Sequence, residues 1–133
     1  WGVRRYQASR VDNNVNGASK RDMRKRRKDT TKLAKTTLRY YNSANALNAL
    51  NDAGKDISKI NSRVTRNYKK TDQLVNKLKK KYAHIDVHAD LEDNGYIIKG
   101  MSVTLAALDK YGNLSSAHSI CAIPDRYDEL RNS

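Results

Sequence analysis

The chain has 133 residues and a net charge of +13, with 38% hydrophobic residues, one Trp and no Phe. A chain of this length forms one domain, here with a small hydrophobic core. No apolar run approaches the roughly 18 residues of a membrane span, so we expect no membrane partner. The single Cys121 excludes both an internal disulfide and a zinc site of paired cysteines.

The charge is divided unevenly along the chain. Residues 1–40 carry a net charge of +10, residues 41–83 carry +7, and residues 84–133 carry −4. The largest change in composition therefore falls at His84. A basic region of this size is typical of proteins that bind nucleic acid or another polyanion.

Residues 1–18 are expected to form a basic extended arm. Asn, Asp and Gly cluster in residues 12–17 without hydrophobic periodicity, which favours an irregular conformation. Arg4 and Arg5 would be available for contacts with phosphate. Tyr6 follows them and is the tyrosine most available for stacking on an unpaired base.

A long helix is predicted next, from an N-cap at Ser19 to a stop at Gly54. Its apolar stripe begins only at Leu33. Its first turns read KRDMRKRRKD, in which seven of ten residues are Lys or Arg. We therefore expect the first half of this helix to project into solvent or onto a partner, and only the second half to pack.

This basic run is the main candidate for phosphate binding, because each phosphate contact releases condensed counterions. A solvated, charged helix end is the alternative. No zinc finger, RNP motif or evident helix-turn-helix is present, so any binding is expected to be non-specific. The candidate residues of the run are Lys20, Arg21, Arg24, Lys25, Arg26, Arg27 and Lys28.

A second helix is predicted after Asp56, which acts as its cap, and its apolar stripe ends near Tyr82. Either Asn67 or Tyr68 occupies one position of the stripe. The short connection between the helices predicts an antiparallel helical hairpin over residues 19–83. Three tyrosines near the stripes are expected in the core: Tyr41, Tyr68 and Tyr82. The opposite, basic face of the second helix adds two candidates for phosphate binding, Lys69 and Lys70.

After the hairpin the hydrophobic period changes from 3.6 to 2, which indicates strands. Turns are predicted at residues 93–95 and 110–113, a bulge at Gly100, and the end of the last strand at Pro124. The prediction is an acidic three-stranded antiparallel β-meander over residues 84–124, packing one face on the hairpin in an α+β fold. Residues 125–133 form a short tail of mixed charge.

The first strand of this meander carries a row of His and Asp that resembles a metal site: His84, Asp86, His88 and Asp90. Residues two apart on a strand lie about 6.6 Å apart and residues four apart about 13 Å, so His84 and His88 cannot share an ion. A third ligand, such as His118, would be needed. A polar outer sheet face is the favoured interpretation, and a metal-dependent nuclease is the least favoured function.

His118 and Cys121 are a candidate nucleophile pair by residue type. Three residues apart on a strand, they face opposite sides of the sheet, which is the wrong geometry. Cys121 lies among apolar residues and is expected to be a small buried hydrophobe. We therefore expect no catalytic residue, no metal and no cofactor.

The first seven residues, WGVRRYQ, resemble a motif in prophage-encoded proteins of Gram-positive bacteria, where a Lys precedes the Trp. Members of that family are virion structural or minor head components. The resemblance covers Trp1 to Gln7 only, and the Thr-Pro that usually follows in the family is missing from this chain. It carries no active-site residue over to this sequence.

The resemblance implies a non-enzymatic, head-associated bacteriophage protein that contacts packaged DNA and other virion proteins. The alternative is a free, non-specific nucleic-acid-binding protein of the host cytoplasm. A homo-oligomer is compatible with either. Because the sequence starts at Trp1 and not at Met, we also expect cleavage before Trp1 during maturation, the alternatives being an upstream segment left out of this sequence or a deliberately shortened chain.

Overall fold

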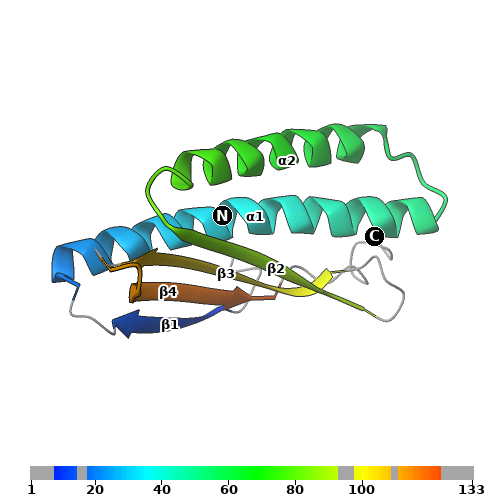
Figure 1. Cartoon of the computed structure of the whole chain (residues 1–133). Coiled ribbons are helices and arrows are strands. Elements are labelled where there is room, and N and C mark those ends of the chain that lie inside the picture. Colours follow the sequence, from blue (N-terminus) through cyan, green and yellow to red (C-terminus); the bar gives the residue numbers. More distant parts are fainter. Residues whose placement is uncertain (1–7, 15–17, 93–97, 109–110, 124–133) are drawn as a thin grey trace.

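A computed structural model shows an α+β fold of two helices and a four-stranded antiparallel sheet (Figure 1). It describes residues 8–14, 18–92, 98–108 and 111–123. In chain order the elements are β1 (Ala8–Asn14), α1 (Lys20–Asp52), α2 (Ser58–Leu78), β2 (His84–Leu91), β3 (Ile98–Leu108) and β4 (Leu114–Ala122). Neither of the two described helices is long and apolar enough to cross a membrane.

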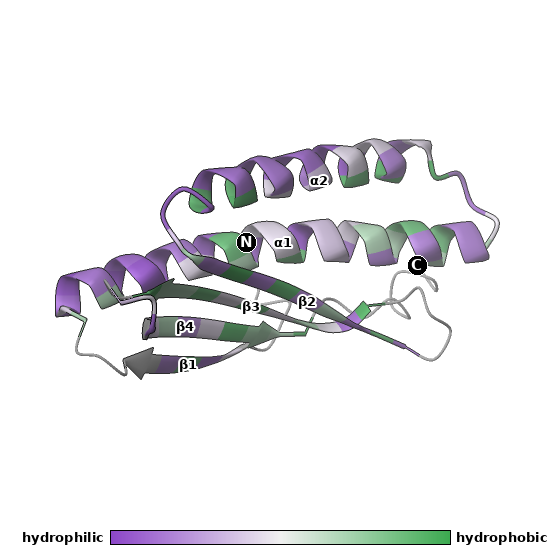
Figure 2. Cartoon of the chain, viewed as in Figure 1, coloured by the Kyte–Doolittle hydropathy of each residue, from purple (hydrophilic) through white to green (hydrophobic). Residues whose placement is uncertain are grey.

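The elements form three layers, with α1 lying between the sheet and α2 (Figure 1). One side of α1 contacts β3 and β4, and another side contacts α2. Figure 2 shows α2 as hydrophilic over most of its surface, with its hydrophobic residues mainly on the side toward α1. The prediction that the sheet packs on a helical hairpin is therefore right for α1, whereas α2 packs on α1.

The sheet has four strands in the order β1-β4-β3-β2, so the predicted three-stranded meander gains a fourth strand. This strand, β1, lies within the segment that the sequence predicts as an arm. It pairs with β4, with Ser9 opposite Cys121 and Asp12 opposite His118. Hydrophobic alternation does not reveal it, because Arg10 and Asp12 face the helix layer while the apolar Val11 is exposed on the other face.

The predicted ends of α1 are confirmed. The Ser19 hydroxyl accepts a hydrogen bond from the backbone N–H of Asp22 at 3.1 Å. At the other end, Gly54 has a φ of +69°, its N–H donates to Asn51 O, and the N–H of Lys55 donates to Leu50 O. This is a Schellman motif, in which the left-handed residue is normally glycine.

The core lies between α1 and the sheet and continues to the end of α2. Leu33 and Leu38 of α1 are fully buried against residues of β3 and β4, and Leu78 joins them from α2. The buried face of α1 begins earlier than predicted, however, because Met23, Arg26 and Thr30 are also buried. The expectation that the first half of α1 projects into solvent is therefore wrong.

The helix–helix contact is polar at its centre. Asn67, and not Tyr68, faces α1: its side-chain amide donates to Arg39 O at 3.3 Å and to the Ser43 hydroxyl at 3.2 Å. Tyr68 is 57% exposed, so its predicted place in the core is wrong, whereas Tyr82 is buried and Tyr41 half-buried as predicted. At the start of α2, the Asp56 carboxylate accepts from the N–H and hydroxyl of Ser58. The N-cap itself is Ile57, so Asp56 lies one residue before the cap position that the sequence predicts for it.

Alternation along β2 is confirmed up to Asp90. Its apolar residues are half-buried toward the helices, and its His and Asp residues are exposed. Leu91 breaks the pattern and is 49% exposed, because the register with β3 shifts between Asp90 and Leu91 and passes over Lys99, next to the predicted bulge at Gly100. The turn at 93–95, Pro124 and the tail lie outside the described residues.

Candidate nucleic-acid interface

A groove runs between α1 and α2 on one flank of the helix pair. It encloses about 270 Å³ and is lined by Lys32, Thr36 and Arg39 of α1 and by Asn67, Lys70 and Leu74 of α2. We call it the basic groove, because three of its six lining residues are cations and none is acidic. The hydrogen bonds from Asn67 to α1, and that from Thr71 to Thr36 O at 3.4 Å, hold the two walls together.

Each wall of the basic groove continues as a strip of cations. Residues three and four apart share one face of a helix, and Lys or Arg occupies such positions along both helices. The α1 strip consists of Arg21, Lys25, Lys28, Lys32, Lys35 and Arg39. The α2 strip consists of Lys59, Arg63, Arg66, Lys70 and Lys77.

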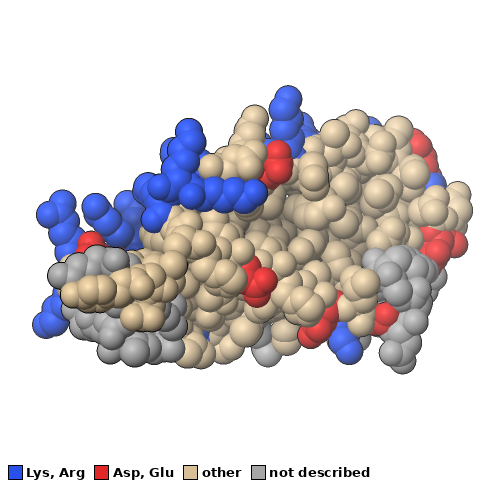
Figure 3. Space-filling view, viewed as in Figure 1, with Lys and Arg blue, Asp and Glu red and all other residues tan. Residues whose placement is uncertain are grey.

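All eleven side chains of the two strips are exposed. Within the described part of the chain, none of them forms an ion pair with an acidic residue. Figure 3 shows Lys and Arg gathered over the first turns of α1 and over the C-terminal end of α2, whereas Asp and Glu are scattered. Such closely spaced like charges repel one another, so a polyanion that neutralises them binds favourably.

Two residues of the predicted basic run serve the fold. Arg26 is only 8% exposed and donates to the Ser116 hydroxyl of β4 and to the Met23 sulfur, while its guanidinium lies 5.7 Å from the centre of the Tyr82 ring. Its buried Nε has no hydrogen-bond partner among the described residues. Arg26 is therefore removed from the set of candidate phosphate contacts.

Arg27 also contacts the sheet. Its Nε donates to Asp12 Oδ2 of β1 at 2.9 Å. The other oxygen of Asp12 lies 2.5 Å from Nδ1 of the buried His118, whose Nε2 is 3.5 Å from Arg10 Nη1. A guanidinium only donates, so both contacts fit the tautomer in which Nε2 accepts from Arg10 and Nδ1 donates to Asp12.

The same contacts affect the ionisation of Asp12. Partial burial acts to raise the pKa of its carboxyl group, but the hydrogen bonds from His118 and Arg27 outweigh it, so the pKa lies below its ordinary value. Arg10 completes the junction by donating to the Thr31 hydroxyl of α1 at 2.8 Å. These polar contacts attach β1 to α1 without a hydrophobic core of their own.

The opposite flank of α1 is closed by Tyr82, which follows α2. Its hydroxyl donates to Asp29 Oδ2 at 2.6 Å, and Lys81 Nζ lies 3.6 Å from the same oxygen. Burial, the hydrogen bond to Asp29 and the negative charge of Asp29 all raise the pKa of Tyr82. Asp29 therefore stabilises the fold on this flank and does not neutralise the basic groove.

The other predicted contacts fall into three groups. Arg21, Lys25, Lys28 and Lys70 belong to the two strips. Lys20, Arg24 and Lys69 are exposed but are not counted in the strips. Arg24 borders the α1 strip, because it lies three residues after Arg21 and four before Lys28. Arg4 and Arg5, like the rest of the WGVRRYQ segment, lie outside the described residues.

The prediction omitted most of the basic groove. Lys32 and Arg39 of α1 were overlooked because they follow the dense basic run, singly and among apolar residues. Their spacing of seven residues was the available signal, since it places both on one helix face. The sequence does not show which face of α1 stays uncovered, because that depends on how α2 packs against it.

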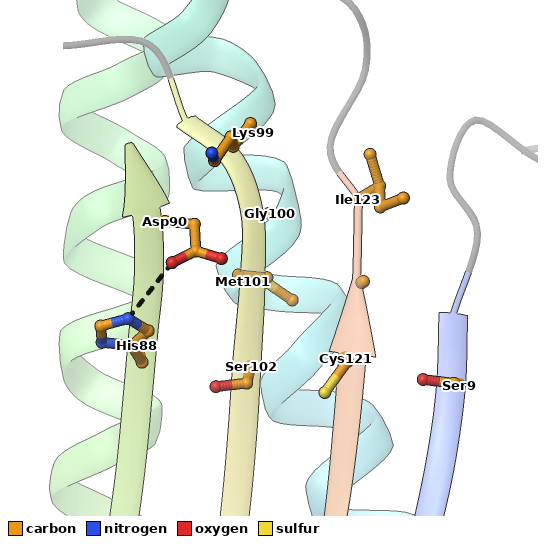
Figure 4. A pocket seen from close by; sticks show the side chains of 10 residues that line it. Ser9, His88, Asp90, Lys99, Gly100, Met101, Ser102, Cys121 and Ile123 are labelled. Carbon is orange, nitrogen blue, oxygen red and sulfur yellow. Dashed lines mark ion pairs between the residues drawn. The ribbon is translucent and has the colours of Figure 1, made fainter. Parts of the chain in front are cut away.

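The predicted His/Asp row lies on the outer sheet face, as expected. Figure 4 shows His88 and Asp90 turned toward each other, and their closest charged atoms are 3.5 Å apart. They border an open hollow of about 560 Å³ that also includes Ser102 and Cys121 on the neighbouring strands. In the described ranges, no three His, Cys, Asp or Glu residues are grouped so that they could hold a metal ion.

Cys121 and His118 point to opposite faces of β4, as predicted, because His118 is buried and Cys121 is exposed. The expectation that Cys121 is buried is wrong. Its neighbours Ile120 and Ala122 both face the core, so the residue between them must face outward.

In comparisons with family models, with curated proteins and with solved structures, nothing matches this chain. The basic groove therefore has to be interpreted from its own geometry.

The junction of β1 with α1 predicts acid sensitivity. The pKa of Asp12 is lower in the folded state than in the unfolded state, where it is about 3.9. Its carboxylate therefore stabilises the fold above that value, and the effect is lost as the pH falls through the lower, folded-state pKa. In thermal melts, Asp12→Asn should lower Tm near neutral pH, and the difference from the parent chain should shrink as the pH falls below the ordinary pKa of an Asp carboxyl group.

Asp86→Asn is the matched control, because Asp86 is exposed on β2 and has no ion pair with a described residue. It should leave Tm nearly unchanged both near neutral pH and in acid. A loss in Asp12→Asn that is equally large in acid and at neutral pH would contradict the assigned role of the carboxylate.

Proposed function

We propose that this chain is a non-enzymatic protein that binds the phosphate backbone of nucleic acid, without reading its sequence, in the basic groove. The observation that supports this most directly is the pair of cationic strips on two helices that share one groove lined by Lys32, Arg39 and Lys70. None of the six described residues that line the groove is acidic.

The physical driving force is electrostatic. A cation that contacts phosphate displaces condensed counterions, and the entropy of their release contributes to binding at low salt. Lysine is a compact point charge on a flexible stem, so it tolerates any base sequence. Seven of the eleven strip residues are Lys, which fits binding to backbone phosphates more than recognition of base edges.

We propose further that the protein is a component of the bacteriophage head. The resemblance of WGVRRYQ to head-associated prophage proteins supports this, as does the division of charge between a basic helical layer and the acidic residues 84–133. Packaged DNA would supply a high concentration of phosphate, so weak contacts would suffice. The exposed outer sheet face, with Asp86 and Asp90, would then be available to other virion proteins.

The first test removes charge from the basic groove. The triple variant Lys32→Gln, Arg39→Gln, Lys70→Gln should bind DNA more weakly than the parent chain, measured by fluorescence anisotropy over a series of salt concentrations. If each residue contacts one phosphate, the slope of log affinity against log salt should become shallower by about 2.7, since each contact contributes about 0.9.

The matched control is Lys79→Gln, Lys80→Gln, Lys99→Gln, which removes the same charge from exposed positions outside the groove lining. Its salt slope should change much less. Equal slopes for the two triple variants would show that net charge alone, and not the groove, determines binding. Both variants should keep the parent's melting temperature, because none of the six side chains is buried.

The second test concerns location. Peptide mass mapping of purified phage particles from the native source should detect this protein at a fixed copy number relative to the major head protein. A protein that is present in the host cytoplasm but absent from particles would contradict the virion proposal and favour the free nucleic-acid binder.

A further inference from the structure

We infer that the basic groove binds double-stranded rather than single-stranded nucleic acid, an inference that rests on the proposed function. It depends on where the structure puts the aromatic side chains relative to the cations. Among the described residues, no aromatic side chain lines the basic groove.

The tyrosines nearest in sequence to the groove residues contact one another instead. The ring centroid of Tyr40 lies 5.3 Å from that of Tyr41 and 5.6 Å from that of Tyr68. Tyr68 precedes Lys70 by two residues, so the two side chains point about 200° apart around the axis of α2. Tyr68 therefore lies on the other side of the contact with α1. Asn67 and Thr71, which face α1, lie between these two directions.

Tyr82 is not available either. It is buried, its hydroxyl is bonded to Asp29, and its ring faces the Arg26 guanidinium. The cations that line the groove and the aromatic rings of the helical layer are therefore separated, with Lys32, Arg39 and Lys70 at the groove and the rings elsewhere.

This separation disfavours a single strand as the ligand. Proteins that hold single strands without sequence preference combine a cationic groove with aromatic rings on which the bases stack. Without rings, the unpaired bases of a single strand gain nothing in the groove. A single strand also has a lower charge density, so it releases fewer counterions for each contact.

The two strips suit a duplex. Packed helices have axes about 8–10 Å apart. Where α1 and α2 run side by side, with Asn67 at Arg39 and Thr71 at Thr36, the cations of the two strips form two adjacent rows. A duplex presents two rows of phosphates on either side of one of its grooves. From Arg21 to Arg39 the α1 strip spans roughly 27 Å at 1.5 Å per residue. That length equals the rise of about 8 base pairs at 3.4 Å per base pair. The phosphate rows wind through most of a turn over this length, so the straight strip contacts them where they pass the groove.

The helical walls keep these rows straight. α1 is one uninterrupted helix from Lys20 to Asp52 and extends past the end of α2, so Arg21 and Lys25 continue the row beyond the enclosed part of the groove (Figure 1). A duplex is stiff over this length, with a persistence length of about 150 base pairs. Two rigid surfaces meet with little loss of conformational freedom, whereas a flexible single strand must be ordered.

The test compares binding of a duplex of about 12 base pairs with binding of each of its separated strands, in DNA and in RNA, at one low salt concentration. The parent chain should bind the DNA or the RNA duplex at least about tenfold more tightly than the corresponding strands. The groove triple variant should lose most of this preference, and the control triple variant should keep it. The duplex that binds more tightly shows whether the groove prefers DNA or RNA.

A second variant, Tyr40→Leu with Tyr68→Leu, should leave duplex affinity unchanged. If single strands bind as tightly as the duplex and the groove triple variant weakens both, the inference is overturned while the proposed function stands. The same holds if the tyrosine variant weakens binding of the strands. If neither duplex nor strand binds at low salt, the proposed function fails together with the inference.

Discussion

The packing of α1 on two sides determines the rest of the molecule. Its apolar face covers the sheet, and a second, partly polar face contacts α2 through Asn67 and Thr71. Tyr82 closes one of the remaining flanks by its bond to Asp29. The other flank stays open, and there Lys32 and Arg39 of α1 share the groove with Lys70 of α2. The basic groove thus forms because the sheet, α2 and Tyr82 cover the other sides of the 33-residue helix α1.

The basic run at the start of α1 combines two roles. Arg26 contacts Ser116 of the inner strand β4 and Arg27 contacts Asp12 of the edge strand β1, in a region where α1 has few apolar side chains. A buried guanidinium is costly unless it has favourable polar contacts. The Arg26 guanidinium donates to the Ser116 hydroxyl and lies near the face of the Tyr82 ring, while its Nε has no partner among the described residues. The neighbouring Lys25 and Lys28 remain exposed. Counting charges in such a run therefore overestimates the number available to a ligand.

Periodicity predicted both helices and the strands β2, β3 and β4, because each has one apolar face. It failed for β1, whose residues facing the helix are Arg10 and Asp12, so that hydrogen bonds rather than apolar contacts hold the strand. It also misplaced Cys121, whose apolar neighbours concealed that it faces outward. The site was predicted in part: the charge of the first helix was evident, but the groove requires α1 and α2 side by side, and that pairing determines which lysines face a common ligand.

The central claim is that the open flank of the helix pair is the binding surface. An amide NMR titration with a short DNA duplex tests it most directly, because it reports on every described element at once. The account predicts shifts concentrated in residues 28–39 and 66–77, with the sheet strands β2 and β3 almost unaffected. Shifts concentrated on the outer face of the sheet, around His88 and Ser102, with the two helices unchanged, would contradict it.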